Sequence, residues 1–170
     1  MLKYKTQMEV LTMVLGNDGR YALVIGSVII NECLKREYKI NTSKLMKLLY
    51  YMQKLHVQKY GEPMFTNEII AGESGPYIDD IMRFYHYGVL GFKEKVEQEI
   101  ILLDTHEDVA SIVLDEMGSL TPIEIMKKSL DDIVFKTIWQ DGIGKNQIIP
   151  YYIMANSKSD FDIKKLSKKK

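Results

Sequence analysis

The chain has 170 residues, the usual length of one domain, which is enough to bury a sizeable core without disulfides or metals. Its 46% hydrophobic and 27% charged residues are ordinary for a globular protein, which excludes disorder as the main state. Lysine plus arginine and aspartate plus glutamate each total 23, and this zero net charge excludes a general attraction to nucleic acid or anionic lipid.

Two helices follow a leader of mixed character in the first third of the chain. Residues 1–20 suggest a short helix and a turn, and residues 21–35 are apolar almost all round, which predicts a central buried helix. Residues 41–60 place apolar side chains at three- and four-residue steps, which predicts an amphipathic helix with Thr42 as N-cap and Gly61 as its end. We expect its polar residues to face solvent. They are Lys44, Lys47, Gln53, Lys54 and Gln58.

A connection and a third helix are expected next. Residues 62–75 connect the elements, and 68–72 within them forms either a short strand or an extended loop. Pro76 suits the first turn of a helix that Gly88 closes. The buried stripe of this helix is predicted to be Ile78, Ile81, Met82 and Tyr85.

The second half of the chain predicts several shorter elements. Residues 97–103 within 93–104 could extend a helix or form a short strand, and we favour an extended or β segment there. A helix with four inward apolar residues covers 107–117. Thr121-Pro122-Ile123-Glu124 is a capping box with proline at the first helical position, so a helix starts there and runs to about Ser129. Further segments complete the body. They are one or two helical turns in 131–140, a loop at 141–144 and a helix from Ile148 to Met154 with Pro150 in its first turn.

These elements predict a mainly α fold: a compact single-domain bundle of about six to seven helices with at most a small β element. Residues 1–20 form an N-terminal leader helix and turn, and residues 21–156 form the helical domain. Residues 157–170 carry five lysines in their last seven positions and are predicted to be a disordered tail.

The compartment is indicated by the single cysteine and by the first residues. Cys33 cannot form a disulfide within the chain, and we expect it to be a small buried hydrophobe. No signal peptide is evident, and the uncharged run 21–31 is about half of the ~20 residues that span a bilayer. We therefore expect a cytoplasmic protein.

The residue patterns do not predict an enzyme. The three histidines form no HExxH motif, and one cysteine is too few for a cysteine-rich zinc site. No phosphate-binding glycine loop or G-x-S-x-G turn is present, so we predict no catalytic residue, no metal site and no cofactor. Nucleic acid is also an improbable partner, because the chain has only Arg20, Arg36 and Arg83 and no arginine-rich recognition helix.

Two motifs follow one another in residues 42–65: TSKLMKLLYY at 42–51 and YGEPMF at 60–65. They resemble the TxxKLxKLLYY helix and the YGxPLF turn of the Panacea domain, also known as the SocA-like antitoxin domain and related to phage-associated GepA-like proteins. Gly75-Pro76-Tyr77 is similar to the element that opens the next helix, and Leu120-Thr121-Pro122 to a start in the second half. Ser129-Leu130 replaces the family's usual Thr-His, and Trp139 follows at a longer spacing. The likeness covers about residues 21–155.

The resemblance implies a function that composition does not. Such domains act as antitoxins, so we expect this chain to bind and neutralise a toxin protein encoded nearby, with delivery to a protease as one route. The alternatives are a phage or mobile-element inhibitor of a host defence or regulatory protein, an unrecognised enzyme, and a nucleic-acid binder that uses the basic tail. A homo-oligomer is compatible with the low net charge. The predicted partner-binding residues are Lys44, Lys47, Tyr51, Glu73, Gly75, Pro76 and Tyr77.

Overall fold

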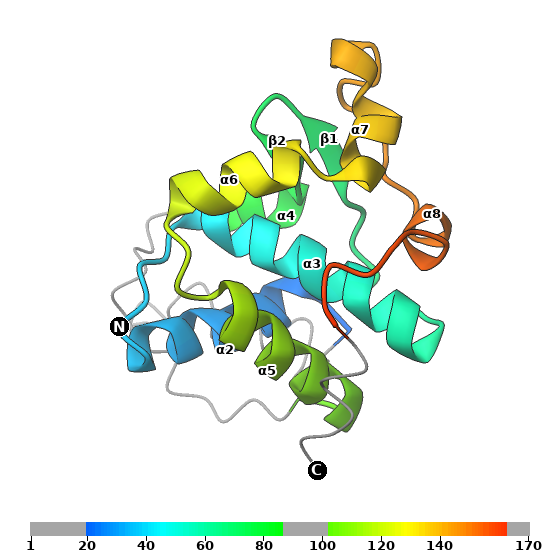
Figure 1. Cartoon of the computed structure of the whole chain (residues 1–170). Coiled ribbons are helices and arrows are strands. Elements are labelled where there is room, and N and C mark those ends of the chain that lie inside the picture. Colours follow the sequence, from blue (N-terminus) through cyan, green and yellow to red (C-terminus); the bar gives the residue numbers. More distant parts are fainter. Residues whose placement is uncertain (1–19, 87–101, 163–170) are drawn as a thin grey trace, which may run out of the picture.

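The computed structural model describes residues 20–86 and 102–162, which form layers of helices around one central helix, α3 (Figure 1). Within these ranges the chain is mainly α with one two-stranded sheet, so the predicted fold class is confirmed. The leader helix, the helix end at Gly88 and the segment from 93 to 101 lie outside the described residues. The helices are α2 (Ala22–Lys35), α3 (Thr42–Tyr60), α4 (Asp79–Ile81), α5 (Asp104–Met117), α6 (Pro122–Leu130), α7 (Ile133–Trp139) and α8 (Tyr151–Ala155). The strands are β1 (Ile70–Gly72) and β2 (Gly75–Tyr77), and short π and 3-10 turns cover Met82–His86 and Gln140–Gly142.

Helix α3 has well-formed ends. Asn41, in an extended conformation, accepts a hydrogen bond from the backbone N–H of Lys44 at 2.8 Å, so Asn41 is the N-cap. The prediction of Thr42 as the cap is wrong by one residue, because Thr42 already has helical geometry. Gly61 ends the helix in the left-handed conformation with φ of 76°, as predicted.

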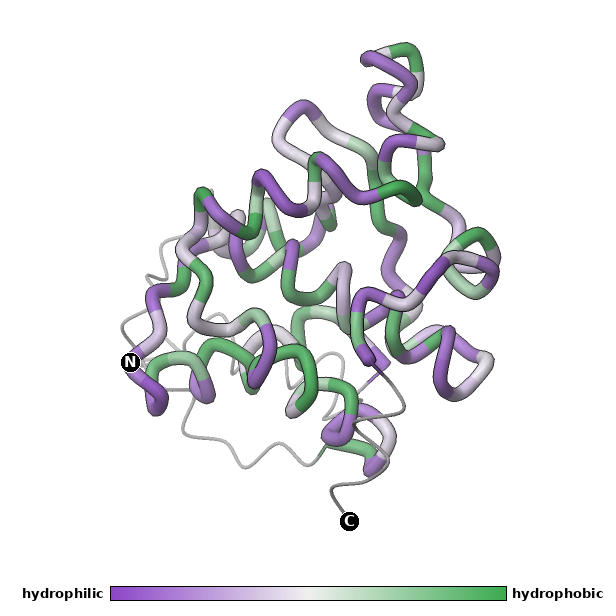
Figure 2. Tube along the Cα trace, in the orientation of Figure 1, coloured by the Kyte–Doolittle hydropathy of each residue, from purple (hydrophilic) through white to green (hydrophobic). Residues whose placement is uncertain are grey.

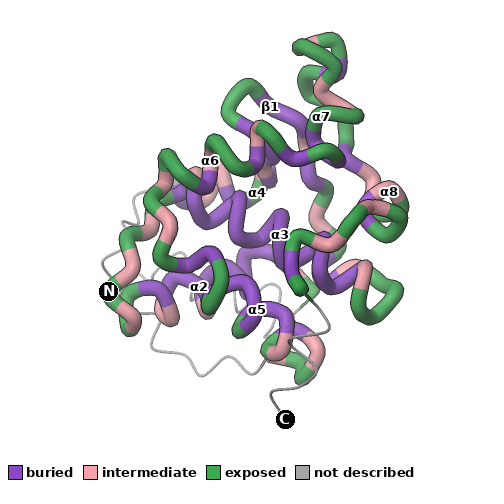
Figure 3. The backbone as a smooth tube through the Cα atoms, viewed as in Figure 1, coloured by how far each residue is buried: buried purple, intermediate pink, exposed green. Residues whose placement is uncertain are grey.

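Helix α3 is buried on nearly every side. Helices α5, α6 and α8 and strand β2 pack against it, and its tube is coloured as buried along most of its length (Figure 3). The expectation that its polar face meets solvent is therefore wrong. Lys44, Lys47 and Lys54 are exposed by only 0%, 1% and 1%. The predicted apolar stripe is also buried, so α3 contributes both faces to the interior.

The β-hairpin explains the position of Pro76. Strands β1 and β2 pair antiparallel with Ala71 opposite Pro76, so Pro76 belongs to a strand and the prediction of a helix start there is wrong. The backbone of Ala71 instead bonds Gln147 and Asn146, on the side away from β2. The Ala71 carbonyl therefore needs no hydrogen bond from Pro76, which has no N–H to donate. The helical turn begins three residues later, at α4.

The capping box is present as predicted. The Thr121 side chain accepts from the Glu124 backbone and the Glu124 carboxylate accepts from the Thr121 backbone, at 3.2 and 2.7 Å. Hydrophobic and hydrophilic residues alternate along α6, which lies over α3 (Figures 1 and 2). This helix therefore turns only one of its sides toward α3.

Two other boundaries differ from the sequence-based expectation. Helix α5 begins one turn earlier than predicted, at Asp104, and its first turn carries Asp104 and Glu107. Carboxylates there favour the positive end of the helix dipole, which accounts for the earlier start. Ile148 pairs with Ile70 in an isolated β-bridge, so the last helix begins only after Pro150.

Part of the predicted tail packs on the body. Phe161 is 7% exposed and joins the core, and Gln58 donates hydrogen bonds to the carbonyl oxygens of Met154 and Ser157 at 3.1 and 3.2 Å. Residues 157–162 therefore differ from the expected disordered tail, whereas 163–170 lie outside the described residues. No helix in the described ranges has both the length and the apolar character needed to span a membrane.

Candidate functional site

One row of α3 carries three of the seven predicted site residues, Lys44, Lys47 and Tyr51. Positions 44, 47, 51, 54 and 58 follow one another at steps of three and four residues, which places them on one side of a helix. Helix α6, strand β2 and helix α8 pack against α3. The three lysines of this row are buried but differ in what their ammonium groups contact.

Lys44 joins the start of α3 to the end of α5. Its Nζ donates hydrogen bonds to the carbonyl oxygens of Lys39 and Gly118, at 2.5 and 2.6 Å. The Gly118 carbonyl follows the last turn of α5, where a cation favourably meets unpaired carbonyl groups. Burial lowers the pKa of Lys44, and these two bonds compensate its buried charge. Lys44 therefore has a structural position.

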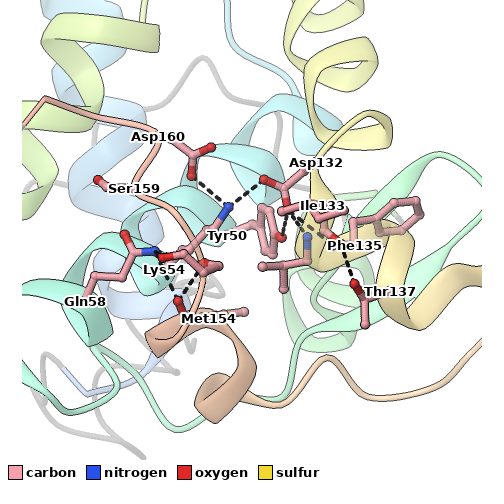
Figure 4. A network of polar contacts seen from close by, with 12 residues as sticks. Tyr50, Lys54, Gln58, Asp132, Ile133, Phe135, Thr137, Met154, Ser159 and Asp160 are labelled. Carbon is pink, nitrogen blue, oxygen red and sulfur yellow. Dashed lines mark hydrogen bonds and ion pairs between the residues drawn. The ribbon is translucent and has the colours of Figure 1, made fainter.

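Lys54 is the centre of a buried ionic network (Figure 4). Its Nζ lies 2.6 Å from Asp132 and 2.9 Å from Asp160, which belongs to the C-terminal segment. Asp132 also accepts a hydrogen bond from the Tyr50 hydroxyl at 2.6 Å. Lys54 therefore links α3 to the start of α7 through a buried ion pair, and to the C-terminal segment through Asp160, which is more exposed.

The Asp132 side chain accepts hydrogen bonds from four donors. Besides Lys54 and Tyr50, its side chain accepts from the backbone N–H groups of Val134 and Phe135 at 3.0 and 3.2 Å, so it caps α7. Burial, and then the Asp132 charge, raise the pKa values of Tyr50 and Tyr51 well above the usual value for tyrosine. Both hydroxyls stay protonated at neutral pH, so the network is suited to holding elements together and not to activating a nucleophile.

Lys47 is the exception in the row. Among the described residues its ammonium makes no hydrogen bond and no ion pair, and burial lowers its pKa to about 8. A Cβ atom placed on Gly75 would lie 3.2 Å from the Lys47 Cε and 2.6 Å from the Ser129 Oγ. Lys47, Gly75 and Ser129 therefore come together where α3, β2 and α6 meet.

The structure separates the predicted partner-binding residues into groups. Lys47 and Gly75 lie together, and Lys44 contacts the end of α5. Tyr51 lies close enough to Asp132 for the carboxylate charge to raise its pKa. Pro76 is buried within β2. Lys44, Lys47, Tyr51 and Pro76 are too buried to form an open surface. Their role in partner binding stays a prediction.

The remaining predicted residues lie at the surface of the hairpin. Glu73 is 71% exposed in its side chain and pairs with Lys145 at 2.6 Å, and the Tyr77 hydroxyl donates to the Asn146 side chain at 3.3 Å. Ile143 and Ile148, from the same loop as Lys145, are 84% and 47% exposed. We name Glu73, Ile143, Lys145 and Ile148 the hairpin-end surface.

A shallow groove lies beside α7. Its volume is about 420 Å³, and the rings of Phe135 and Trp139 stack with centroids 5.7 Å apart at its wall. Gln140 and Asp141 both have positive φ, 43° and 55°, a conformation that costs free energy in residues other than glycine. The groove is lined by Leu130, Phe135, Lys136, Trp139, Gln140 and Asp141.

Sequence reasoning missed Asp160, Ser129 and the loop at 143–148. Asp132 caps α7, but a cap position does not reveal its bond to Lys54, 78 residues away. No local spacing encodes that pairing. Within the described ranges, no three histidine, cysteine, aspartate or glutamate side chains gather in a way that could hold a metal ion.

Comparison with known proteins supports the resemblance seen in the motifs. The family profile described as antitoxin SocA-like, Panacea domain matches residues 45–133, more than half of the chain. No curated protein and no solved structure matches the chain significantly. The matched range includes the α3 row from Lys47 onward, the hairpin, the capping box and Asp132, whereas Lys44 lies just before it. The chain therefore belongs to the antitoxin SocA-like, Panacea domain family.

Proposed function

We propose that this protein is an antitoxin that binds a toxin protein encoded by a neighbouring gene and neutralises it by association. The observation that carries the proposal is the family match over residues 45–133. The buried network around Lys54 supports it, because every member serves to hold elements together and none is poised for bond breaking. Binding energy, and not catalysis, then performs the biological work.

We propose the hairpin-end surface as the place where the toxin docks. Ile143 is 84% exposed and Ile148 47%, and both belong to the loop that carries Lys145, the partner of the exposed Glu73. Apolar side chains surrounded by polar groups are typical of the centre of a protein interface. The structure also holds this surface on ordered backbone, because Ala71 and Ile69 bond the backbone of residues 146–149.

Co-expression tests the proposal directly. The neighbouring open reading frame is expressed alone and together with this chain, and growth is followed in both cultures. We expect arrest with the neighbour alone and recovery when both are present. A neighbour without toxicity, or an arrest that this chain does not relieve, would contradict the proposal.

The half-life of the toxin separates two routes of neutralisation. A blocking antitoxin leaves the amount of toxin unchanged or raises it, whereas an adaptor for proteolysis shortens its half-life. The half-life is measured by pulse-chase with and without this chain, and a folded variant that fails to rescue growth serves as the control.

A further inference from the structure

Lys47 is a buried cation without a counter-charge. It lies on α3 between Lys44, which donates to two carbonyl oxygens, and Lys54, which pairs with two carboxylates. Lys47 is 1% exposed, yet its ammonium has neither kind of partner within the described part of the chain. An uncompensated charge in the interior destabilises a fold, so its presence calls for a physical explanation.

The ammonium of Lys47 is charged at neutral pH. Burial alone lowers its pKa, to about 8, and no carboxylate of the described residues raises it again. At pH 7 roughly nine molecules in ten still carry the proton. The site therefore presents a positive charge that lacks its partner, and an arriving anion would gain an electrostatic interaction that solvent screens poorly.

The surroundings place this charge just beneath the surface. The Lys47 Nζ would lie 3.7 Å from a Cβ atom on Gly75, so the bare backbone of Gly75 covers it. Gly75 follows the exposed hairpin turn at Glu73 and Ser74. The turn is closed by the β1–β2 pairing of Gly72 with Gly75, and it also carries the exposed Glu73–Lys145 ion pair, which contributes little to stability. A partner group that reaches Lys47 would have to displace this turn.

We propose that Lys47 is the anion-accepting group of the partner-binding site, and that a carboxylate from the bound protein pairs with it beneath the Glu73–Ser74 turn. A protein carboxylate suits the site because Lys47 is a buried cation without a carboxylate among the described residues, and Lys145 adds a second positive charge at the turn. The incoming acidic side chain would compete with Glu73 for Lys145 and then continue to Lys47. This inference rests on the proposed function and specifies the chemistry that the partner must offer.

The first test compares two buried lysines in the full-length protein without a partner. Lys47→Met keeps the volume of the side chain and removes the unpaired charge, so its melting temperature should equal or exceed that of the wild type. Lys44→Met, the matched control, leaves two carbonyl oxygens without their donor and should melt several degrees lower. If the melting temperature of Lys47→Met falls as far as that of Lys44→Met, Lys47 has a structural role and the proposal is overturned.

The second test adds a carboxylate probe. Sodium acetate replaces sodium chloride at constant ionic strength while unfolding is followed. A saturable rise in the melting temperature of the wild type that Lys47→Met lacks supports the proposal, and equal shifts in both proteins overturn it. Because no partner is needed, this result stands whether or not the neighbouring protein proves to be a toxin.

The third test measures affinity for the neighbouring gene product by calorimetry. Losing a buried interfacial charge pair costs ~30-fold or more in affinity, and we expect that loss for Lys47→Met. Lys59→Met, which removes an exposed partner of Asp108 at the other end of α3, should bind as the wild type does. Unchanged affinity of a folded Lys47→Met would remove Lys47 from the interface while leaving the antitoxin function in place.

Discussion

Three lysines of one helix show how the same side chain takes different roles. Lys44 bonds carbonyl oxygens, Lys54 bonds carboxylates and Lys47 bonds neither in the described structure. The cost of transferring the charge from water is similar for each, so the partners decide whether the charge stabilises the fold. The effects of substituting them should therefore differ in sign as well as in size.

Substitution of Lys54 should be strongly destabilising. Lys54→Met leaves the buried carboxylate of Asp132 without its cation and also breaks the pair with the more exposed Asp160, and we expect a loss of about 3–5 kcal/mol in the free energy of unfolding. Lys59→Met breaks the partly exposed pair with Asp108 and should cost less than about 1 kcal/mol. Urea unfolding of both variants measures the difference, and similar losses would show that the Lys54 network contributes no more than a surface pair.

The pH dependence of stability isolates Lys47. Its pKa in the folded protein, about 8, lies below its ordinary value of 10.5. Between these values the unfolded chain binds more protons at this residue, so stability should rise with pH there and show no Lys47-dependent change below pH 7. Relative to Lys47→Met, the wild type should gain up to about 1.4 kcal/mol per pH unit between pH 8 and 10. Parallel stability curves would contradict the lowered pKa.

At the scale of elements, local sequence signals determine where helices begin and end, whereas long-range contacts determine which elements pair and pack. The helix periods, the Gly61 end and the Thr121–Glu124 box depend on neighbours within one or two turns, so they were predictable from the sequence. Pro76 suggested a helix start because proline is favourable in the first turn of a helix as well as at the edge of a sheet. Its place in β2 depends on the backbone of Ala71 turning toward residues 146 and 147, far along the chain.

The candidate site was predictable only in part for the same reason. The apolar stripe of α3 was predictable from its three- and four-residue steps, but the burial of its polar residues was not. Whether they meet solvent depends on which elements cover that side, and α6, α8 and β2 do so. Polarity alone does not separate a solvated lysine from one bonded to Asp132, because the partner lies 78 residues away.

The capping box of α6 gives a test at this scale. Thr121→Ala removes the acceptor for the Glu124 backbone N–H, and a loss of about 1 kcal/mol in the free energy of unfolding is expected. Ser119→Ala, two residues earlier and exposed, serves as the matched control and should change stability little. Chemical denaturation measures both, and equal stability of the two variants would argue against the box as a stabilising feature.

At the scale of the molecule, the C-terminal segment belongs to the folded body. Asp160 pairs with Lys54 and Phe161 fills a place in the core, so the segment completes contacts of α3. Ser157 and Met154 add hydrogen bonds to Gln58. These contacts extend the domain several residues beyond the end suggested by composition.

Two truncations test this extension. A chain ending at residue 158 loses Asp160 and Phe161, and we expect it to be less stable by about 3–5 kcal/mol than a chain ending at residue 162. Thermal and urea unfolding of the two truncated proteins give the comparison. If both unfold at the same midpoint, the contacts of Asp160 and Phe161 do not stabilise the protein in solution.

An antitoxin that acts by association must perform its function through a surface, here the hairpin-end surface, and not through a catalytic centre. The most direct measurement is the affinity of the purified protein for the product of the neighbouring gene, with one exposed isoleucine changed at a time. We predict that Ile143→Glu, at the hairpin-end surface, weakens binding at least ~10-fold, whereas Ile123→Glu, at the start of α6 and 62% exposed, binds as the wild type does. No binding by the wild type, or equal affinities for both folded variants, would contradict the account.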